Sequence, residues 1–359
     1  TADFLSRDEI QLNNAQISEY LHDKVVLVTG GGGSIGSELC RQIMRYQPQR
    51  LLIFDIYENC AYELETELKN KYGADAPIIT LIGSIRDKAR LDEVFETYHP
   101  SVVFHAAAHK HVPLMEISPA EAVKNNVFGT KNLLTSAAEH GVERFVQLST
   151  DKAVNPTNVM GASKRLCEMI VQMMNDRSAT EYVAVRFGNV LGSAGSVIPL
   201  FRKQIRSGGP VTVTDKRVIR YFMTIPEACR LVLEAGSMGN GGEIYIFDMG
   251  NPVKIVDLAK RMISLSGRTD VKIEFTGLRH GEKLYEELLN VKELTKPTYH
   301  DKIMIATVRE YDYDEVKERI QKLIDVSYTY DQMKIVAAMK DIVPEFVSKN
   351  SCFEILDKK

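Results

Sequence analysis

The sequence predicts an α/β protein built on a doubly wound parallel sheet, with a smaller region towards the C-terminus. Three observations support this fold class. Short apolar runs alternate with helical patterns from residue 24 to residue 188. A glycine-rich turn from Thr29 to Gly36 follows the first run, and the acidic residue Asp55 ends the second. Strands that alternate with helices in this way form parallel sheets of the Rossmann-like type.

Short apolar runs bounded by glycine, polar or charged residues are expected to be buried strands. They cover 24–28, 50–55, 78–82, 101–105, 144–149, 182–186 and 243–248. Periodic apolar spacing predicts helices between and after these strands. The helices cover 34–46, 58–72, 121–140, 161–175, 225–236, 255–266, 313–325 and 330–340, and the last two are expected to be exposed.

The composition is that of an ordinary globular protein, with 44% hydrophobic and 26% charged residues. A net charge of −3 without a basic run argues against nucleic acid as a partner. No apolar run approaches the roughly 20 residues that cross a bilayer, so we expect no membrane contact within this chain. Five cysteines without a CxxC pair favour reduced thiols and a cytoplasmic location over disulfides or a zinc site.

The glycine-rich turn has the spacing of a dinucleotide-binding loop. Gly30, Gly33 and Gly36 give the pattern TGxxGxxG, and glycine lets a pyrophosphate approach the backbone closely. Ser34 and Ile35 then open a helix whose free N–H groups and dipole favour phosphate. The alternative is a tight strand–helix turn that binds no nucleotide. The preceding strand and the following helix favour the binding loop.

Further cofactor contacts are expected beyond this loop. Asp55 lies 19 residues past Gly36, where a carboxylate bonds the ribose hydroxyls, and no arginine follows it directly. NAD is therefore expected rather than NADP. The other candidates are Ser84 and Ile85 beside the adenine, Ala106, Ala107 and Ala108 beneath the nicotinamide-side ribose, and Asn126.

An acid and a base stand side by side where the predicted strand 144–149 ends. Thr150, Asp151 and Lys152 follow this strand, and Met160 to Lys164 begin the next helix with the sequence MGASK. The carboxyl ends of parallel strands form the ligand-binding edge of such sheets. The neighbouring Asp151 and Lys152 therefore favour elimination chemistry, and the alternative is a solvated ion pair at a polar strand end.

These segments resemble the extended short-chain dehydrogenase/reductase superfamily. Within it, the chain is similar to the catalytic domain of the long, membrane-anchored type of UDP-N-acetylglucosamine 4,6-dehydratase, a CapD-like family of capsular polysaccharide biosynthesis. The matching segments are VLVTGGGGSIGSELCRQI, FHAAAHKHVPLME, NNVFGTKNL, LSTDKAVNPTNVMGASKR, VRFGNVLGSAGSVIPLF, DKRVIRYFMTIPEA and GLRHGEKLYEEL, within residues 25–288. Met160 is typical of the long branch, whereas the soluble inverting branch has tyrosine there. Ser84 departs from the aspartate that relatives often carry.

The resemblance implies a lyase with bound NAD that oxidises sugar carbon 4, eliminates water across carbons 5 and 6, and reduces carbon 6. The product is a UDP-linked 4-keto-6-deoxy-N-acetylhexosamine. Lys152 is the expected base, with burial and Lys164 lowering its pKa, and Asp151 is the expected acid. Thr150 contacts the 4-hydroxyl and relays its proton to Asp151, because the Met160 thioether cannot accept a proton. Lys164 also holds the nicotinamide ribose.

Substrate contacts are expected from the looser second half of the chain. Asn189 suits a phosphate, Arg220 and Arg279 suit the pyrophosphate or the uridine ribose, and Glu282 suits ribose hydroxyls. Lys110 is a further substrate candidate. The alternative for the arginines is an ordinary surface role.

The predicted organisation combines these assignments. Residues 1–23 form a lead-in segment, 24–188 form an NAD-binding Rossmann domain completed by 223–250, 189–222 and 251–294 form a substrate-binding region, and 295–359 form a C-terminal helical tail. The lead-in FLSRDEIQL resembles the junction that follows a membrane region in the long branch. Such a region is therefore expected upstream of Thr1.

The histidines His105, His109 and His111 lack acidic or thiol companions at ligand spacing, so we expect packing or hydrogen-bonding roles and no metal. The resemblance also implies a homodimer or higher homo-oligomer in which the helices 121–140 and 161–175 pair between subunits. The competing functions are a UDP-sugar 4-epimerase, a 5-inverting 4,6-dehydratase and a non-catalytic nucleotide-binding protein. An epimerase would need the tyrosine that is missing at position 160.

Overall fold

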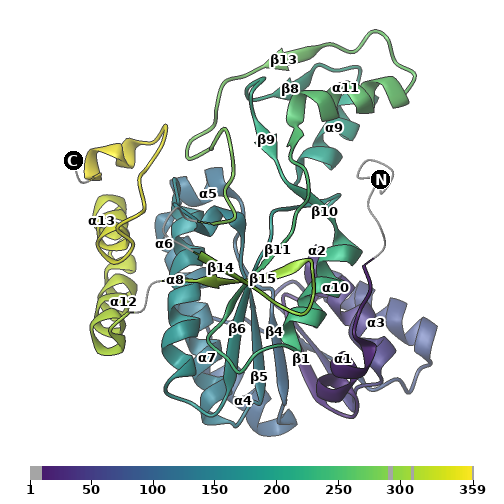
Figure 1. The fold of residues 1–359 in the computed structure, drawn as a ribbon, viewed down its shortest axis with the longest axis vertical. Helices are drawn as coiled ribbons and strands as arrows, with labels where there is room; N and C mark the ends of the chain where they lie inside the picture. The colour runs from purple at the N-terminus through teal and green to yellow at the C-terminus, as the bar shows by residue number, and fades with distance from the viewer. Residues whose placement is uncertain (1–9, 290–293, 309–310, 358–359) are drawn as a thin grey trace.

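The computed structural model describes residues 10–289, 294–308 and 311–357. Within these residues a nine-stranded sheet forms the centre, in the order β14-β15-β11-β6-β5-β4-β1-β2-β3 (Figure 1). Neighbours from β3 to β11 pair in parallel, whereas β15 and β14 are added antiparallel. The strands are β1 Val25–Thr29, β2 Arg50–Asp55, β3 Ile78–Ile82, β4 Val102–His105, β5 Arg144–Leu148, β6 Glu181–Arg186, β11 Ile244–Phe247, β14 Leu294–Pro297 and β15 Ile303–Thr307. The predicted fold class is confirmed.

Helices cover both faces of the sheet, and each face has its own hydrophobic cluster. One face carries α1 Asn14–Leu21, α2 Ser34–Ile43, the short 3₁₀ turn Met44–Tyr46, α3 Glu58–Tyr72 and α10 Ile225–Gly236. The other carries α4 Lys88–Tyr98, α5 Val112–Ile117, α7 Gly129–Glu139 and α8 Val159–Asn175. Apolar residues on alternating sides of each strand feed both clusters, which is why the strands are nearly continuous apolar runs.

The helix predicted over 121–140 forms with a change of winding. It consists of α6 Pro119–Ala122, a π-helical segment Val123–Phe128 and then α7. Such π segments occur within α-helices and often lie at functional sites. Here the segment carries Asn126, one of the residues predicted to contact the cofactor.

A smaller group of elements stands above the carboxyl edge of the sheet (Figure 1). It contains β7 Asn189–Leu191, α9 Val197–Arg206, β8 Val211–Val213, β9 Ile219–Arg220, β10 Phe222–Thr224, β12 Val253–Lys254, α11 Ile255–Leu265 and β13 Ile273–Phe275. Much of this group packs around a third hydrophobic cluster. All of the group except the end of β10 comes from the regions predicted to bind substrate, 189–222 and 251–294, of which residues 290–293 lie outside the described part.

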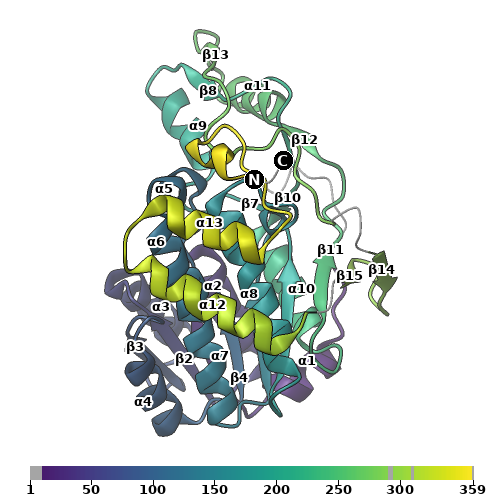
Figure 2. The ribbon, with the colours of Figure 1, turned by 90° about the vertical axis from the view of Figure 1, so that its left-hand side faces the viewer.

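The C-terminal region differs from the predicted helical tail. It begins with β14 and β15, which extend the main sheet, and continues with α12 Tyr313–Ser327, α13 Gln332–Ile342 and a 3₁₀ turn, Cys352–Leu356. The expectation of exposed helices is wrong. Buried apolar stripes on α12 and α13 join the cluster of the α7–α8 face, and the hairpin lies across that face (Figure 2).

This packing bears on the expected pairing of helices 121–140 and 161–175 between subunits. In the structure α12 and α13 contact the π segment and α8 within the same chain. The Arg165 guanidinium of α8 also bonds to Glu345 (3.2 Å) and to the Tyr311 hydroxyl (3.0 Å). Part of the face that was expected to meet a second subunit, at the π segment and α8, is therefore covered by the chain's own C-terminal hairpin.

The lead-in contains an element that the sequence did not predict. Residues 1–9 lie outside the described part, but α1 follows them and buries Ile17 and Leu21. The Tyr20 hydroxyl donates to the Leu233 carbonyl of α10 at 2.7 Å, so α1 is fixed to the main body. Within the described residues, no helix combines the length and apolar character that a membrane crossing requires.

Candidate active site

The glycine-rich loop connects β1 to α2 and leaves no room for side chains at two positions. A Cβ on Gly36 would lie 2.0 Å from the Gly30 carbonyl oxygen, well inside van der Waals contact. Gly30 has a φ of +65°, and a Cβ there would lie 2.7 Å from the Ala107 nitrogen after β4. The loop is therefore a tight backbone cradle, which is the geometry that a pyrophosphate needs at a helix N-terminus.

Two predicted cofactor residues hold this cradle from either side. The Asp55 carboxylate, at the end of β2, accepts hydrogen bonds from the backbone N–H groups of Gly32 and Tyr57, both at 2.9 Å. The Ser34 hydroxyl, in the first turn of α2, accepts from the Ala194 N–H at 3.2 Å. The structure thus places Asp55 and Ser34 beside the loop, and their contact with a nucleotide stays a prediction.

The predicted cofactor residues Ser84, Ile85 and Asn126 differ in burial and in partners. Ile85 is buried in the hydrophobic core, and the Ser84 hydroxyl accepts from the Arg86 N–H at 3.2 Å. The buried Asn126 amide accepts from the His109 N–H at 2.8 Å and donates to the His109 carbonyl at 2.9 Å. Its contacts hold the loop after β4 in place, so a direct contact with a cofactor would need one of them to change.

The predicted acid and base lie together on a 3₁₀ turn, Asp151–Ala153, directly after β5. Asp151 is fully buried, and its Oδ1 accepts from the Thr150 hydroxyl and from the Lys152 Nζ, both at 3.0 Å. Its Oδ2 is buried without a hydrogen-bond partner among the described residues. A buried carboxylate oxygen without a donor is costly, and this one lies beside Gly188, where a Cβ would approach it to 3.1 Å.

Helix α8 approaches this turn closely because of one glycine. A Cβ on Gly161 would lie 2.2 Å from the Lys152 carbonyl oxygen, and the Asn158 side chain caps the helix by accepting from the Gly161 N–H at 2.7 Å. Met160 is buried in the hydrophobic core, where a tyrosine hydroxyl would otherwise be expected. Lys164, one turn along, is also buried, and burial lowers the pKa of its ammonium.

The expectation that Lys152 has a lowered pKa is wrong in this structure. Burial disfavours its ammonium, but the carboxylates of Asp151 and Glu286 outweigh burial and raise the pKa of Lys152 above its usual value. Lys164 does not figure among the causes. The two carboxylates thus stabilise the ammonium form of Lys152, whereas a base must be in its neutral amine form.

The sequence analysis missed Glu286. Its Oε1 lies 3.9 Å from the Lys152 Nζ and 3.7 Å from the Arg220 Nε, and its Oε2 is buried without a partner among the described residues. Burial raises the pKa of this carboxyl, and Asp151 adds to the effect. The residue stands in the motif GLRHGEKLYEEL, but nothing in that spacing says which of its acids turns inward.

Arg220 lies beside these acids, but its donors face protein oxygens. The guanidinium donates to the carbonyls of Ile219 (2.7 Å), Lys283 (2.8 Å) and Leu284 (3.2 Å), and to the Glu282 carboxylate at 3.4 Å. The predicted contact between Arg220 and a nucleotide would therefore have to replace one of these bonds. In the structure Arg220 ties β9 to the loop that follows β13.

The remaining predicted substrate residues surround the same site. The Asn189 side-chain oxygen accepts from the Lys152 Nζ at 3.3 Å, and the Lys110 Nζ donates to the Ala194 carbonyl at 2.8 Å. Burial and the Lys152 charge lower the pKa of Lys110. Glu282 accepts from the Arg279 backbone N–H at 2.9 Å, while the Arg279 residue itself is exposed.

A buried charged network supports the residues that precede the turn Asp151–Ala153. The Glu168 carboxylate of α8 accepts from the Ser149 hydroxyl (2.7 Å), from the Arg186 Nε and Nη2 (both 2.7 Å) and from the Arg165 Nη1 (3.0 Å). The Glu168 and Arg186 side chains are fully buried. Because Ser149 precedes Thr150, this network fixes the end of β5 from which the acid and the base project. The sequence analysis did not identify it.

His105 has the hydrogen-bonding role that was predicted for it. His105 is buried between the hydroxyls of Thr29 (2.6 Å) and Thr130 (2.8 Å), and burial, helped by Lys164, lowers its pKa to about 3. It therefore acts as a neutral hydrogen-bonding partner in the core.

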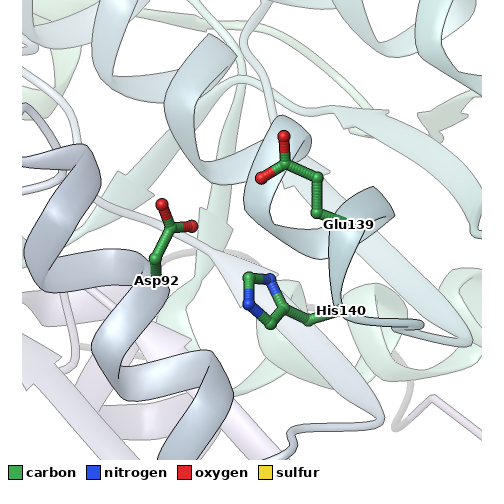
Figure 3. Close-up of side chains that lie close together, drawn as sticks. All are labelled: Asp92, Glu139 and His140. Carbon is green, nitrogen blue, oxygen red and sulfur yellow. The ribbon is translucent and has the colours of Figure 1, made fainter.

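A separate group, Asp92, Glu139 and His140, brings possible metal ligands within 4.8 Å of one another (Figure 3). The Lys88 ammonium donates to both of its carboxylates at 2.7 Å, so the group is an ion-pair cluster. Asp92 lies on α4, whereas Glu139 and His140 end α7 just before β5, at the opposite end of that strand from Asp151.

Comparison with known proteins agrees with this geometry. The profile of a family described as "Polysaccharide biosynthesis protein" matches residues 26–308. The capsular polysaccharide biosynthesis protein CapD of Staphylococcus aureus is 54% identical over 90% of this chain and 54% of its own length. This chain thus spans about half of that relative.

Two further relatives match over most of their own length. A protein of Campylobacter jejuni named UDP-N-acetylglucosamine 4,6-dehydratase (inverting) is 31% identical over 89% of this chain and 96% of its own. The X-ray structure of Pen from Bacillus thuringiensis has a TM-score of 0.74 and 33% identity, covering 84% of this chain and 99% of that one. The chain belongs to the CapD-like polysaccharide biosynthesis family of extended short-chain dehydrogenases/reductases, a family of nucleotide-sugar dehydratases and epimerases.

Proposed function

We propose that the protein is an NAD-dependent UDP-N-acetylglucosamine 4,6-dehydratase that retains the configuration at carbon 5. The observation that carries the proposal is the Asp151–Lys152 pair at the end of β5, 3.0 Å apart and partly shielded from water. Elimination of water needs one group that accepts a proton and another that donates one. A simple oxidation needs only the acceptor, and Met160 occupies the place where that acceptor is expected.

NAD fits the cradle around α2. The backbone at Gly30 and Gly36 packs too closely for side chains, so the loop stays compact beside the start of α2, whose N–H groups are suited to the pyrophosphate. Asp55 would hold the adenine-side ribose, and Lys164 the nicotinamide-side ribose. When bound, NAD supplies a reversible hydride acceptor.

The nucleotide sugar would lie between the sheet edge and the smaller group of elements. Lys110 and Arg279 offer positive charge to the diphosphate, and Asn189 and Glu282 offer polar contacts to the phosphate and the ribose. We assign the regions 189–222 and 251–294 to substrate binding on this basis. Arg220 would position Glu282 and the loop that carries it.

The proton movements follow from the contacts of the catalytic turn. Thr150 would bond the 4-hydroxyl and pass its proton to Asp151, whose Oδ1 lies 3.0 Å from the Thr150 hydroxyl. Lys152, once neutral, would take the proton from carbon 5. Asp151 in its protonated form would give a proton to the hydroxyl that leaves carbon 6. Both groups must sit on one side of a single sugar ring, and one short turn provides that.

Mass spectrometry of UDP-N-acetylglucosamine incubated with the protein and NAD tests the proposal. We expect the loss of one water with the wild type, none with Lys152→Ala, and wild-type turnover with Lys322→Ala, which removes an exposed lysine of α12. In D₂O the product should carry deuterium at carbon 5 with retained configuration.

Other outcomes would contradict parts of the proposal. An unchanged mass with a new stereoisomer would indicate a 4-epimerase. Loss of water with inversion at carbon 5 would leave the dehydratase assignment in place and overturn retention. An absence of turnover with any UDP-sugar, in protein that binds NAD, would reject the dehydratase assignment for this chain.

A further inference from the structure

Glu286 is a buried acid to which the proposed mechanism gives no part. It lies in the loop that follows β13, far along the chain from the catalytic turn, and is 7% exposed. Its Oε1 faces two cations, the Lys152 Nζ at 3.9 Å and the Arg220 Nε at 3.7 Å. Its Oε2 has no hydrogen-bond partner among the described residues. A buried carboxylate placed in this way is not explained by surface charge or by packing alone.

The charges around Lys152 are unevenly matched. Asp151 contacts the Lys152 ammonium directly, and Glu286 lies on a second side of it. Arg220 offsets part of the Glu286 charge, although most of its own donors go to backbone carbonyls and Glu282. Two further lysines add positive charge without bonding to these carboxylates. Lys283 acts on Glu286 but bonds to Glu287 and the Val154 carbonyl, and Lys110 acts on Lys152. Lys152 is therefore a cation between two carboxylates.

We infer that Glu286 is a positioning residue that, together with Asp151, keeps Lys152 protonated until its proton is handed to a carboxylate inside the site. The inference rests on the proposed function and adds a residue and a source of protons to it. An opposite charge near an ammonium stabilises the charged form, and the effect is large where water is excluded. A single carboxylate would leave Lys152 easier to deprotonate by solvent.

The transfer conserves protons and charge at each step. Oxidation at carbon 4 leaves the hydroxyl proton on Asp151, as proposed above. The Lys152 ammonium then gives a proton to the Glu286 carboxylate, 3.9 Å away, which leaves a neutral amine and a carboxylic acid. The amine takes the proton from carbon 5, and Asp151 protonates the departing hydroxyl oxygen, so water leaves. When the hydride returns to carbon 6, Lys152 gives a proton to carbon 5 and Glu286 returns its proton to the Lys152 amine.

The pH at which Lys152 becomes neutral can be measured without turnover. Acetic anhydride acylates only the neutral amine, so peptide mass spectrometry of Lys152 acetylation against pH gives its midpoint in the NAD-bound protein. The comparison uses the wild type, Glu286→Gln and Glu287→Gln. Glu287 is the matched control, because it is the next residue, is only partly buried and bonds to Lys283 instead.

In Glu286→Gln the midpoint should fall by about one pH unit, because the amide keeps the shape but removes the anion that favours the ammonium. In Glu287→Gln it should not move. A midpoint that stays or rises in Glu286→Gln overturns the inference. If that variant does not fold, Glu286→Asp should lower the midpoint in the same direction by drawing the carboxylate back, and no movement there also overturns it.

Kinetics then separate this inference from the proposed function. The ascending limb of kcat against pH should move to lower pH in Glu286→Gln and stay in place in Glu287→Gln. A residue with a purely structural role would instead lower kcat by the same factor at every pH. If the wild type dehydrates no nucleotide sugar, the proposed function fails while the acetylation result still stands. If the wild type is active and the limb does not move, the inference alone fails.

Discussion

The two halves of the candidate site are built in different ways. The cofactor cradle comes mainly from one continuous stretch, β1 to α2, and its shape depends on backbone atoms that pack too closely for side chains. The catalytic side is assembled from side chains far apart in the sequence, with Lys152 beside Asn189 and Glu286. A site formed by backbone atoms can therefore be predicted from the local spacing of glycines. A site formed by buried charged side chains depends on tertiary contacts between residues far apart in the sequence.

Lys152→Met is expected to have the largest effect on the catalytic half of the site while leaving the cofactor half unchanged. The substitution keeps an unbranched side chain and removes the amine, so kcat should fall about a thousandfold while NAD affinity is unchanged. Turnover and NAD binding by fluorescence are measured on the same preparation. A comparable loss of NAD affinity would show that the two halves are not independent.

A loss of stability confined to the catalytic side is expected from Glu168→Gln. The change leaves the buried Arg186 and Arg165 without their anion, which should lower the free energy of unfolding by about 3 kcal/mol in urea. Glu181→Gln is the control, because Glu181 is a partly exposed residue at the start of β6, and its loss should lower the free energy of unfolding far less. Gln147→Glu would not serve, because it adds a buried charge.

The effect of Glu168→Gln on the free energy of unfolding should depend on pH. Burial favours a protonated Glu168, but Arg186, Arg165 and Ser149 outweigh burial and lower its pKa. A carboxyl whose folded pKa is lowered stabilises the protein above its unfolded pKa of about 4.3, and loses this contribution as pH falls through the folded value. The stability gap between wild type and Glu168→Gln should therefore shrink below about pH 4. A constant gap would mean that charge is not its cause.

The cofactor half should respond to a single methyl group. Gly36→Ala places a Cβ against the Gly30 carbonyl, which should cost about 2 kcal/mol of stability and weaken NAD binding. Gly33→Ala is the matched control, because its Cβ would meet the same oxygen at 3.2 Å and needs a much smaller shift. Equal effects of the two variants would argue against a steric cradle.

The smallest effect is expected from Asp55→Asn. The amide can still accept from the Gly32 N–H but loses the charge that favours ribose hydroxyls, so NAD affinity should fall about tenfold with kcat unchanged at saturating NAD. Glu58→Gln, in the first turn of α3, serves as the control. An unchanged NAD affinity would remove Asp55 from the cofactor site.

Periodicity was sufficient for most of the fold. The helices expected at 58–72 and 225–236 form over those residues, because their apolar stripes and flanking residues define both ends. β14 and β15 were missed, since an added antiparallel edge depends on a partner strand rather than on its own pattern. The apolar stripes of α12 and α13 were recognised as helical, but their burial requires knowledge of the face that they cover.

For the site, the sequence placed Asp151 and Lys152 correctly at the end of β5 but gave the wrong direction for the Lys152 pKa. The expectation relied on burial and on Lys164, a neighbour along the chain. The charges that decide the direction include Glu286, which reaches Lys152 only through the tertiary fold. Electrostatic shifts depend on distances in space, and spacing along the chain does not supply them.

The α12–α13 hairpin has a consequence for how the protein responds to concentration. Where a helix face is buried against a second subunit, dilution dissociates the subunits, exposes the face and lowers the stability of the fold. Here the shelter for α8, which carries Met160 and Lys164, is linked covalently to the same chain. Its local concentration is fixed, so the part of α8 that α13 covers stays covered at nanomolar and at micromolar protein alike.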